Sequence, residues 1–121
     1  MKDSRSVIKL NKAVRYLSWA DYFVNLLLHN CLFADTAYNL LGFFEKKNVV
    51  YAVVEQPFVK ATEKTDLSHV EQFMRSNGFP KLRNNDYCNP EFRVILKKLH
   101  DKNVLTNNGI LYFIDTEFYF E

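Results

Sequence analysis

The most constraining feature of this chain is the order of polar and apolar residues between Leu99 and Asp115. A polar segment ends at Asn103, an Asn-Asn-Gly turn follows at residues 107–109, and a second apolar run ends at Asp115. Two apolar runs on either side of an Asn-Gly turn predict a β-hairpin. Such a hairpin brings Asn103 and Asp115 to the same open end, where their oxygen atoms suit a hard cation such as Mg²⁺ and, through it, phosphates.

The composition predicts one folded domain without a nucleic-acid surface. The chain has 121 residues, of which 48% are hydrophobic and 16% aromatic, which is enough for a core of packed rings and too apolar for disorder. Its formal net charge is +2, and the lysines and arginines are scattered among acidic residues. We therefore expect a single domain over residues 1–121, and the charge pattern disfavours nucleic acid as a partner.

Neither a targeting signal nor a membrane span is expected from the sequence. The charged N-terminus is not followed by an apolar segment, and the longest apolar stretch, residues 23–33, is interrupted by Asn and His. Cys31 and Cys88 lie far apart and lack metal-ligand spacing, so reduced thiols are expected. These features predict a cytoplasmic protein without a membrane partner.

The N-terminal part of the chain predicts a short strand at residues 6–10 and a helix at residues 19–33. Ser18 and Asp21 form a capping-box pattern at the start of the helix. Apolar residues follow at helical spacing, which predicts that this helix packs on a sheet. His29 lies on the helix without a partner pattern, so we expect a surface or cap-adjacent role for it.

Two further apolar runs, residues 38–44 and 49–55, are joined by a short polar segment and predict an antiparallel hairpin. The second strand is expected to end at Pro57, because proline lacks the N–H that a strand ladder requires. Residues 66–76 predict a second helix, since apolar residues recur on one face and Asn77-Gly78 forms a C-terminal stop.

Three segments of the chain occur in the same order as three functional segments of kinase-like phosphotransferases. They are Val7-Ile8-Lys9, residues 51–58 and residues 99–115. They resemble, respectively, the strand whose lysine pairs with nucleotide phosphates, the hinge that binds adenine, and the catalytic loop with its metal-binding strand. The whole chain looks still more like the kinase-like domain of bacterial polyvalent proteins, which is found in mobile elements and gut Bacteroidetes. The residues that carry this closer resemblance are 6–9, 35–38, 42–43, 56–58, 99–105 and 111–116.

The resemblance implies an α+β fold. We expect an antiparallel sheet with packed helices, resembling a kinase N-lobe plus the catalytic-loop hairpin and lacking the helical C-lobe. Residues 79–91 are rich in turn residues. The periodicity of residues 92–96 fits either a strand or a helix running to Leu99, and the resemblance favours the strand.

The resemblance also implies ATP and Mg²⁺ as cofactors, because kinase-like enzymes hold nucleotide phosphates through a lysine and a metal ion. A hinge contacts the nucleotide through backbone atoms, so the identity of its side chains says little about nucleotide binding. The implied nucleotide-binding residues are Lys9, Glu55, Gln56 and Phe58, and the implied metal ligands are Asn103 and Asp115.

Position 98 departs from the family pattern. The family has an Asp immediately before Leu-His, and this Asp accepts the proton of the substrate hydroxyl. Lys98 stands there instead and cannot act as a carboxylate base, although its charge suits a phosphate. Asp101 is the nearby carboxylate that would have to replace the missing base. No glycine precedes Lys9, so we expect weak nucleotide binding and little or no phosphoryl transfer.

A second hypothesis from the same residues is a non-catalytic interaction module. In this interpretation the kinase-like scaffold has lost its ligands and presents a surface to a protein partner. A nucleotide and a protein are therefore the two kinds of partner that the sequence predicts.

Overall fold

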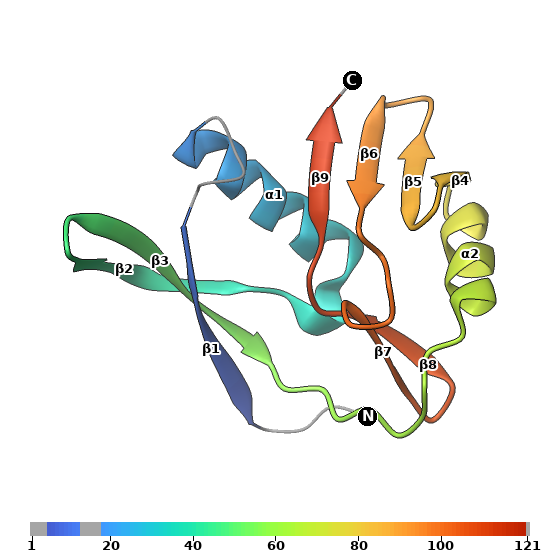
Figure 1. The fold of residues 1–121 in the computed structure, drawn as a ribbon, viewed down its shortest axis with the longest axis horizontal. Helices are drawn as coiled ribbons and strands as arrows, with labels where there is room; N and C mark the ends of the chain where they lie inside the picture. The colour runs from blue at the N-terminus through green and yellow to red at the C-terminus, as the bar shows by residue number, and fades with distance from the viewer. Residues whose placement is uncertain (1–4, 13–17, 121) are drawn as a thin grey trace. The chain divides into compact units, whose positions relative to one another are not determined.

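The computed structural model describes residues 5–12 and 18–120, and its fold is α+β (Figure 1). It consists of two compact units, an N-terminal one ending at Phe58 and a C-terminal one beginning at Val59. Within the described residues, the sheets are antiparallel and there are two α-helices. Neither of these described helices has the length and hydropathy of a membrane span.

The N-terminal unit is a three-stranded sheet with one α-helix, and it matches the predicted order of elements. The central strand of the sheet is β3, which pairs antiparallel with both β1 and β2. Lys47 and Asn48 join β2 to β3 with φ values of 52° and 63°, as a tight two-residue hairpin turn requires. The elements are β1 (Ser6–Asn11), α1 (Trp19–Leu32), the 3-10 helix η1 (Ala34–Thr36), β2 (Asn39–Lys46) and β3 (Val49–Pro57).

Helix α1 begins at its predicted cap and packs on the sheet. The Ser18 hydroxyl accepts a hydrogen bond from the Asp21 N–H at 3.3 Å, which satisfies one of the donors at the helix start. Phe43 of β2 lies 5.7 Å from the Trp19 ring and 6.1 Å from the Phe23 ring. The prediction that this helix packs on a sheet is therefore confirmed.

His29 is placed differently from the sequence expectation. Its side chain is only 1% exposed, so the surface role predicted for it is wrong. The ring is held by the backbone and hydroxyl oxygens of Thr36, 3.0 and 3.1 Å from Nε2. A buried polar ring is tolerated where it finds such partners, and Thr36 is too distant from the helix for periodicity to reveal it.

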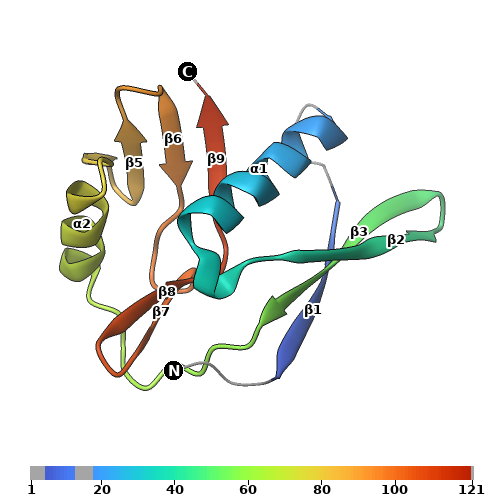
Figure 2. The same cartoon turned by 180° about the vertical axis from the view of Figure 1, so that it is seen from behind.

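The C-terminal unit contains one helix, a four-stranded sheet and a separate two-stranded hairpin. The sheet has the strand order β4-β5-β6-β9, and these strands lie side by side in both views (Figures 1 and 2). The hairpin is formed by β7 and β8. The elements are α2 (Leu67–Ser76), β4 (Lys81–Arg83), β5 (Asp86–Asn89), β6 (Val94–Lys97), β7 (Val104–Asn107), β8 (Ile110–Phe113) and β9 (Glu117–Phe120).

The strand interpretation of residues 92–96 is confirmed, with β6 at Val94–Lys97. The turn-rich segment before it nevertheless contains β4 and β5, and the chain end forms β9. Strand β9 pairs with β6, with Val94 opposite Phe120 and Lys97 opposite Glu117. Short strands of this kind are stabilised by neighbours distant in sequence, so local composition does not reveal them.

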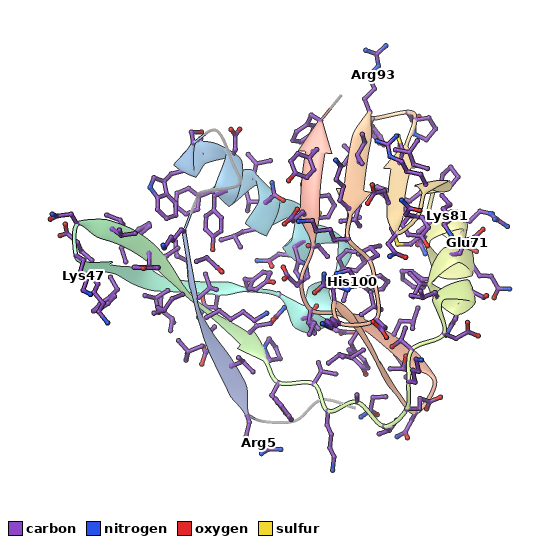
Figure 3. The ribbon with its side chains drawn as sticks, in the orientation of Figure 1. Arg5, Lys47, Glu71, Lys81, Arg93 and His100 are labelled. Carbon is purple, nitrogen blue, oxygen red and sulfur yellow. The ribbon has the colours of Figure 1, made fainter. Side chains whose placement is uncertain are left out.

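Helix α2 is tied to the neighbouring strand by charged and apolar contacts. Figure 3 shows the side chains of Glu71 and Lys81 close together, and their charged atoms are 3.7 Å apart. Val70 and Met74 on the inner face of α2 are 0% and 2% exposed, as the predicted apolar stripe requires. Phe73 is more exposed, but its ring lies 5.3 Å from that of Phe113 on β8.

Candidate functional site

The hairpin predicted from residues 99–115 is present and places Asn103 and Asp115 at one end. Val104 of β7 is opposite Phe113 of β8, and the next residue pair continues the ladder, since the Ile114 N–H donates to the Asn103 carbonyl at 2.9 Å. Asp115 directly follows Ile114. The amide of Asn103 and the carboxylate of Asp115 therefore belong to the same open end of the hairpin.

The Asn103 side chain is oriented by the loop that precedes it. Its Nδ2 donates to the Lys98 carbonyl at 2.8 Å and lies 3.4 Å from Nε2 of His100, the residue labelled in Figure 3. The His100 carbonyl accepts the N–H groups of Asn103 and Val104 at 3.0 and 3.2 Å, which closes the turn. These contacts fix which end of the amide carries nitrogen, and they direct the Asn103 oxygen away from the Lys98 carbonyl.

Because the Lys98–Asn103 contact closes the loop, Asn103→Ala is expected to lower the free energy of unfolding by about 1 kcal/mol. Chemical denaturation of the purified chain measures this change. Lys102→Ala is the matched control, since Lys102 is exposed on the same turn and is expected to change stability by less than about 0.5 kcal/mol. Equal effects of the two substitutions would show that the amide does not hold the loop.

Lys98 is engaged by a carboxylate that sequence reasoning missed. Its Nζ lies 3.5 Å from Oε1 of Glu117, and the Tyr119 hydroxyl donates to the other oxygen, Oε2, at 3.2 Å. The Glu117 side chain is 6% exposed, whereas that of Lys98 is 49% exposed. An acid at the start of a short strand normally indicates a solvated position, so no sequence signal pointed to this pair.

The backbone at Lys98 has the left-handed conformation, with φ of 64°. Its N–H donates to Oδ1 of Asp86 at 3.2 Å. Asp101 lies on the exposed turn between His100 and Asn103. The geometry therefore places Lys98 beside Glu117, and the idea that Asp101 replaces the missing base stays a prediction.

In the N-terminal unit, Lys9 lies on the side of the sheet that faces α1. Lys9 is opposite Val54 in the β1–β3 ladder, and side chains two residues apart in a strand share a face, so Lys9, Val54 and Gln56 are on the same side. The Nζ atom of Lys9 is 5.5 Å from the centre of the Tyr38 ring. Lys9 is half-buried, in contrast to a solvated edge lysine.

The predicted hinge residues have different environments. The Gln56 side chain is 2% exposed and donates to the Thr36 carbonyl at 2.9 Å, which is a structural role. Glu55 points to the opposite face of β3 because neighbouring residues in a strand alternate. The Phe58 N–H donates to the Arg5 carbonyl at 2.9 Å, so the end of the predicted hinge is bound to the residue that precedes β1.

The pKa of His29 is lowered to about 4, mainly by burial; the bond to the Thr36 backbone opposes this shift, and the positive charge of Lys9 adds to it. His29 is therefore neutral at pH 7. A buried neutral histidine in the neighbourhood of Lys9 is a second feature that the sequence did not reveal, because a lone histidine on a helix carries no partner pattern.

The donors at the hairpin end fit a magnesium ion. An amide oxygen from Asn103 and a carboxylate from Asp115 are hard oxygen ligands, and Mg²⁺ is commonly held by one or two protein ligands together with water and phosphate oxygens. Within the part of the chain that the structure describes, no group of three or more His, Cys, Asp and Glu side chains has metal-binding geometry.

The described structure has the features of a kinase-like domain. These are an α+β fold, a half-buried lysine on an edge strand, and an Asn and an Asp at one hairpin end. The family model described as a serine/threonine/tyrosine kinase found in polyvalent proteins matches residues 1–121. The chain belongs to this family, which confirms the resemblance identified in its sequence. Searches of curated proteins and of solved structures gave no match.

Proposed function

We propose that this kinase-like domain binds ATP together with Mg²⁺ and transfers phosphoryl groups slowly or not at all. The observation that carries this proposal is the loop between residues 98 and 103. Its Asn103 side chain is oriented by the Lys98 carbonyl, beside the Asp115 end of the hairpin. The residue that supplies that carbonyl is a lysine whose charge contacts Glu117.

Each proposed binding residue has a separate role. Asn103 and Asp115 hold the metal ion, which when bound neutralises phosphate charge. Lys9 contributes a second positive charge for the phosphates, and its half-buried position strengthens such an interaction relative to bulk water. The backbone of residues 55–58 contacts the adenine ring, because the ladder with β2 ends at Glu55.

Impaired transfer follows from the charge at position 98. A lysine ammonium already carries its proton and cannot accept another from a substrate hydroxyl. Its ammonium also contacts the carboxylate of Glu117. The chain thus has the donors for a metal–nucleotide complex, but at position 98, where transfer requires a base, it has a lysine.

The proposal predicts that nucleotide binding depends on Lys9 and on Asp115. We expect wild type to bind Mg²⁺–ATP with a dissociation constant nearer millimolar than micromolar. Lys9→Met and Asp115→Asn should each weaken binding about ten- to a hundredfold, because each removes a charge-assisted contact. NMR titration with ATP, with and without Mg²⁺, measures these affinities, and wild-type binding should weaken when Mg²⁺ is omitted.

Two charge-matched variants serve as controls. Lys12→Met removes an exposed lysine near the end of β1, and Asp35→Asn removes an exposed carboxylate of η1. Both should bind Mg²⁺–ATP like wild type. If all five proteins bind equally, then Lys9 and Asp115 are not the site; if only the two site variants lose affinity, the assignment is supported.

A second candidate function is favoured by an apolar surface of the N-terminal sheet. Ile8, Leu10 and Phe44 are 55%, 53% and 47% exposed, and their ladder partners place them on the face opposite Lys9. Such a patch is typical of a protein-interaction surface. The interaction module becomes the better description if wild type shows no saturable change at tens of millimolar nucleotide.

A further inference from the structure

Strand β1 forms one edge of the N-terminal sheet in the part of the chain that the structure describes. Its strand partner there is β3, in the order β1-β3-β2. An edge strand carries a row of backbone N–H and C=O groups that point away from its own sheet, and such a row is a template for pairing with another chain. The outer side of β1 is therefore a candidate contact surface.

The β1–β3 register shows which backbone groups of β1 point outward. Residues of an antiparallel pair alternate between those that exchange hydrogen bonds with the partner strand and those that do not. Ser6 is opposite Pro57, which has no N–H to donate. At the next position, the Phe58 N–H donates to the Arg5 carbonyl at 2.9 Å. The odd-numbered residues of β1 therefore bond toward β3, and the N–H and C=O groups of residues 6, 8 and 10 point away from it.

The outward-pointing residues also include exposed apolar side chains. Ile8 and Leu10 are 55% and 53% exposed, although both lie in a strand. The register of β1 runs from Ser6 to Asn11 without interruption, whereas the opposite edge, β2, has a register shift between residues 40 and 42. A bulge at an edge disfavours further pairing. Of these two edges, β1 is therefore the better suited to accept another strand.

We propose that two copies of this chain associate by pairing their β1 strands antiparallel about a two-fold axis at Ile8. In this register Ile8 is opposite Ile8 of the other copy, and Ser6 is opposite Leu10. Each residue whose backbone groups point outward then meets another such residue, as a hydrogen-bonded pair requires. The register also places Lys9 opposite Val7, so the two Lys9 side chains do not face each other directly.

A second copy is the partner that this edge fits best, because the strand is complementary to itself. Among the possible two-fold axes, the axis at Ile8 is the one that pairs residues 6, 8 and 10 entirely among themselves. A two-fold contact uses the same surface on both copies, so one register satisfies both strands at once. The pairing also joins the open faces of the two sheets. The apolar surface formed by Ile8, Leu10 and Phe44 then continues from one copy into the other.

Charges at position 8 test this register. Ile8→Lys and Ile8→Glu each place two like charges opposite each other at the axis, so each variant alone should dissociate about tenfold more readily than wild type. An equal mixture of the two variants should associate again, because each lysine then faces a glutamate. Sedimentation equilibrium between about 10 μM and 1 mM protein measures the dissociation constants. Equal constants for wild type, both variants and the mixture contradict the proposal.

A proline at position 8 tests the backbone contact without adding a charge. Ile8→Pro removes an N–H that points away from β3, so the folded single copy should persist while the dimer is lost. Val7→Pro is the contrasting variant, because it removes an N–H that bonds toward β3, and it should destabilise the folded chain itself. In wild type, hydrogen exchange of the Ile8 and Leu10 amides should slow as the protein concentration rises. Exchange rates that do not depend on concentration overturn the pairing.

Phe44→Lys is the control for association through the open face of the sheet. Phe44 is 47% exposed on the same face as Ile8, but it lies on β2 at the other edge. Edge pairing predicts that this variant keeps the wild-type dissociation constant. A dimer that Phe44→Lys disrupts and Ile8→Pro does not is a face-to-face dimer and contradicts the proposal. A wild-type chain that stays monomeric at the highest concentration also overturns it and leaves the β1 edge to a different partner.

This inference names a partner for the apolar surface described above and does not require nucleotide binding. Asp115→Asn, which removes a proposed metal ligand from the C-terminal unit, should leave the dissociation constant of the dimer unchanged. If no nucleotide binds but the position 8 variants dissociate the dimer, the edge pairing stands and the nucleotide assignment is wrong. If nucleotide binds and wild type is monomeric, the edge pairing is wrong and the nucleotide assignment stands.

Discussion

Restoring a carboxylate at position 98 is expected to increase phosphoryl transfer by about a hundredfold or more, which is the usual contribution of a positioned general base. The substitution is Lys98→Asp. Position 98 has the left-handed backbone conformation, with φ of 64°, which Asp tolerates better than most residues do. The carbonyl of residue 98 would still accept the Asn103 amide, so the loop geometry is expected to persist.

The neighbouring Glu117 complicates this substitution. Its carboxylate is buried and lies 3.5 Å from the Lys98 ammonium, so Lys98→Asp replaces an attraction with a repulsion between like charges. Loss of a fully buried ion-pair partner costs several kcal/mol. Lys98 is 49% exposed, and solvent screening reduces the expected loss to about 1 kcal/mol. The double variant Lys98→Asp with Glu117→Gln removes the repulsion and should recover stability.

The increase in phosphoryl transfer is tested by measuring ADP release with and without Mg²⁺ and by mass analysis for autophosphorylation. Lys98→Asn with Glu117→Gln is the matched control, because it removes both charges without introducing a base, and it should stay at the wild-type background. Rapid transfer by the wild-type protein would contradict the assignment of position 98 as the missing base. The same background rate in the Asp and Asn double variants would show that other required groups are absent.

The sequence predicted the hairpin correctly because its signals are local. Asn108 and Gly109 have φ values of 49° and 81°, as expected for a two-residue turn, and the flanking apolar runs then determine the register. Once the register is set, Asn103 and Asp115 necessarily lie at the same end. The helix cap at Ser18 was predictable for the same reason, since its hydroxyl accepts from an N–H only three residues away.

The contacts that the sequence missed join residues distant along the chain. Glu117 reaches Lys98 only because β9 returns to pair with β6, and a four-residue strand has too weak a local preference to show this. Likewise, the buried side chains of His29 and Gln56 both bond to the Thr36 carbonyl, a convergence that requires β3 and η1 to be packed together. The predicted roles of Lys9, Asn103 and Asp115 depend on ligands and remain predictions.

The buried His29 is expected to make the stability of the protein sensitive to acid. Its pKa is about 4 in the folded chain, against about 6.5 when the chain is unfolded, so below pH 6.5 the unfolded state binds more protons. Stability should therefore fall as the pH is lowered from 6.5 to 4. The loss attributable to this residue should approach about 3 kcal/mol at the lower limit, because one pKa unit corresponds to about 1.4 kcal/mol.

His29→Gln removes this titration and keeps a side chain that can donate to the Thr36 carbonyl. Urea denaturation of wild type and variant at several pH values between 4 and 7.5 isolates the histidine, because carboxylates titrate in both proteins and cancel in the difference. The variant should be the less stable protein at pH 7, since it loses the packing of the ring, and this gap should narrow or reverse toward pH 4. His69→Gln is the control for the same substitution at a histidine that is not buried. A constant difference between wild type and His29→Gln across the range would mean that His29 does not remain neutral inside the folded chain.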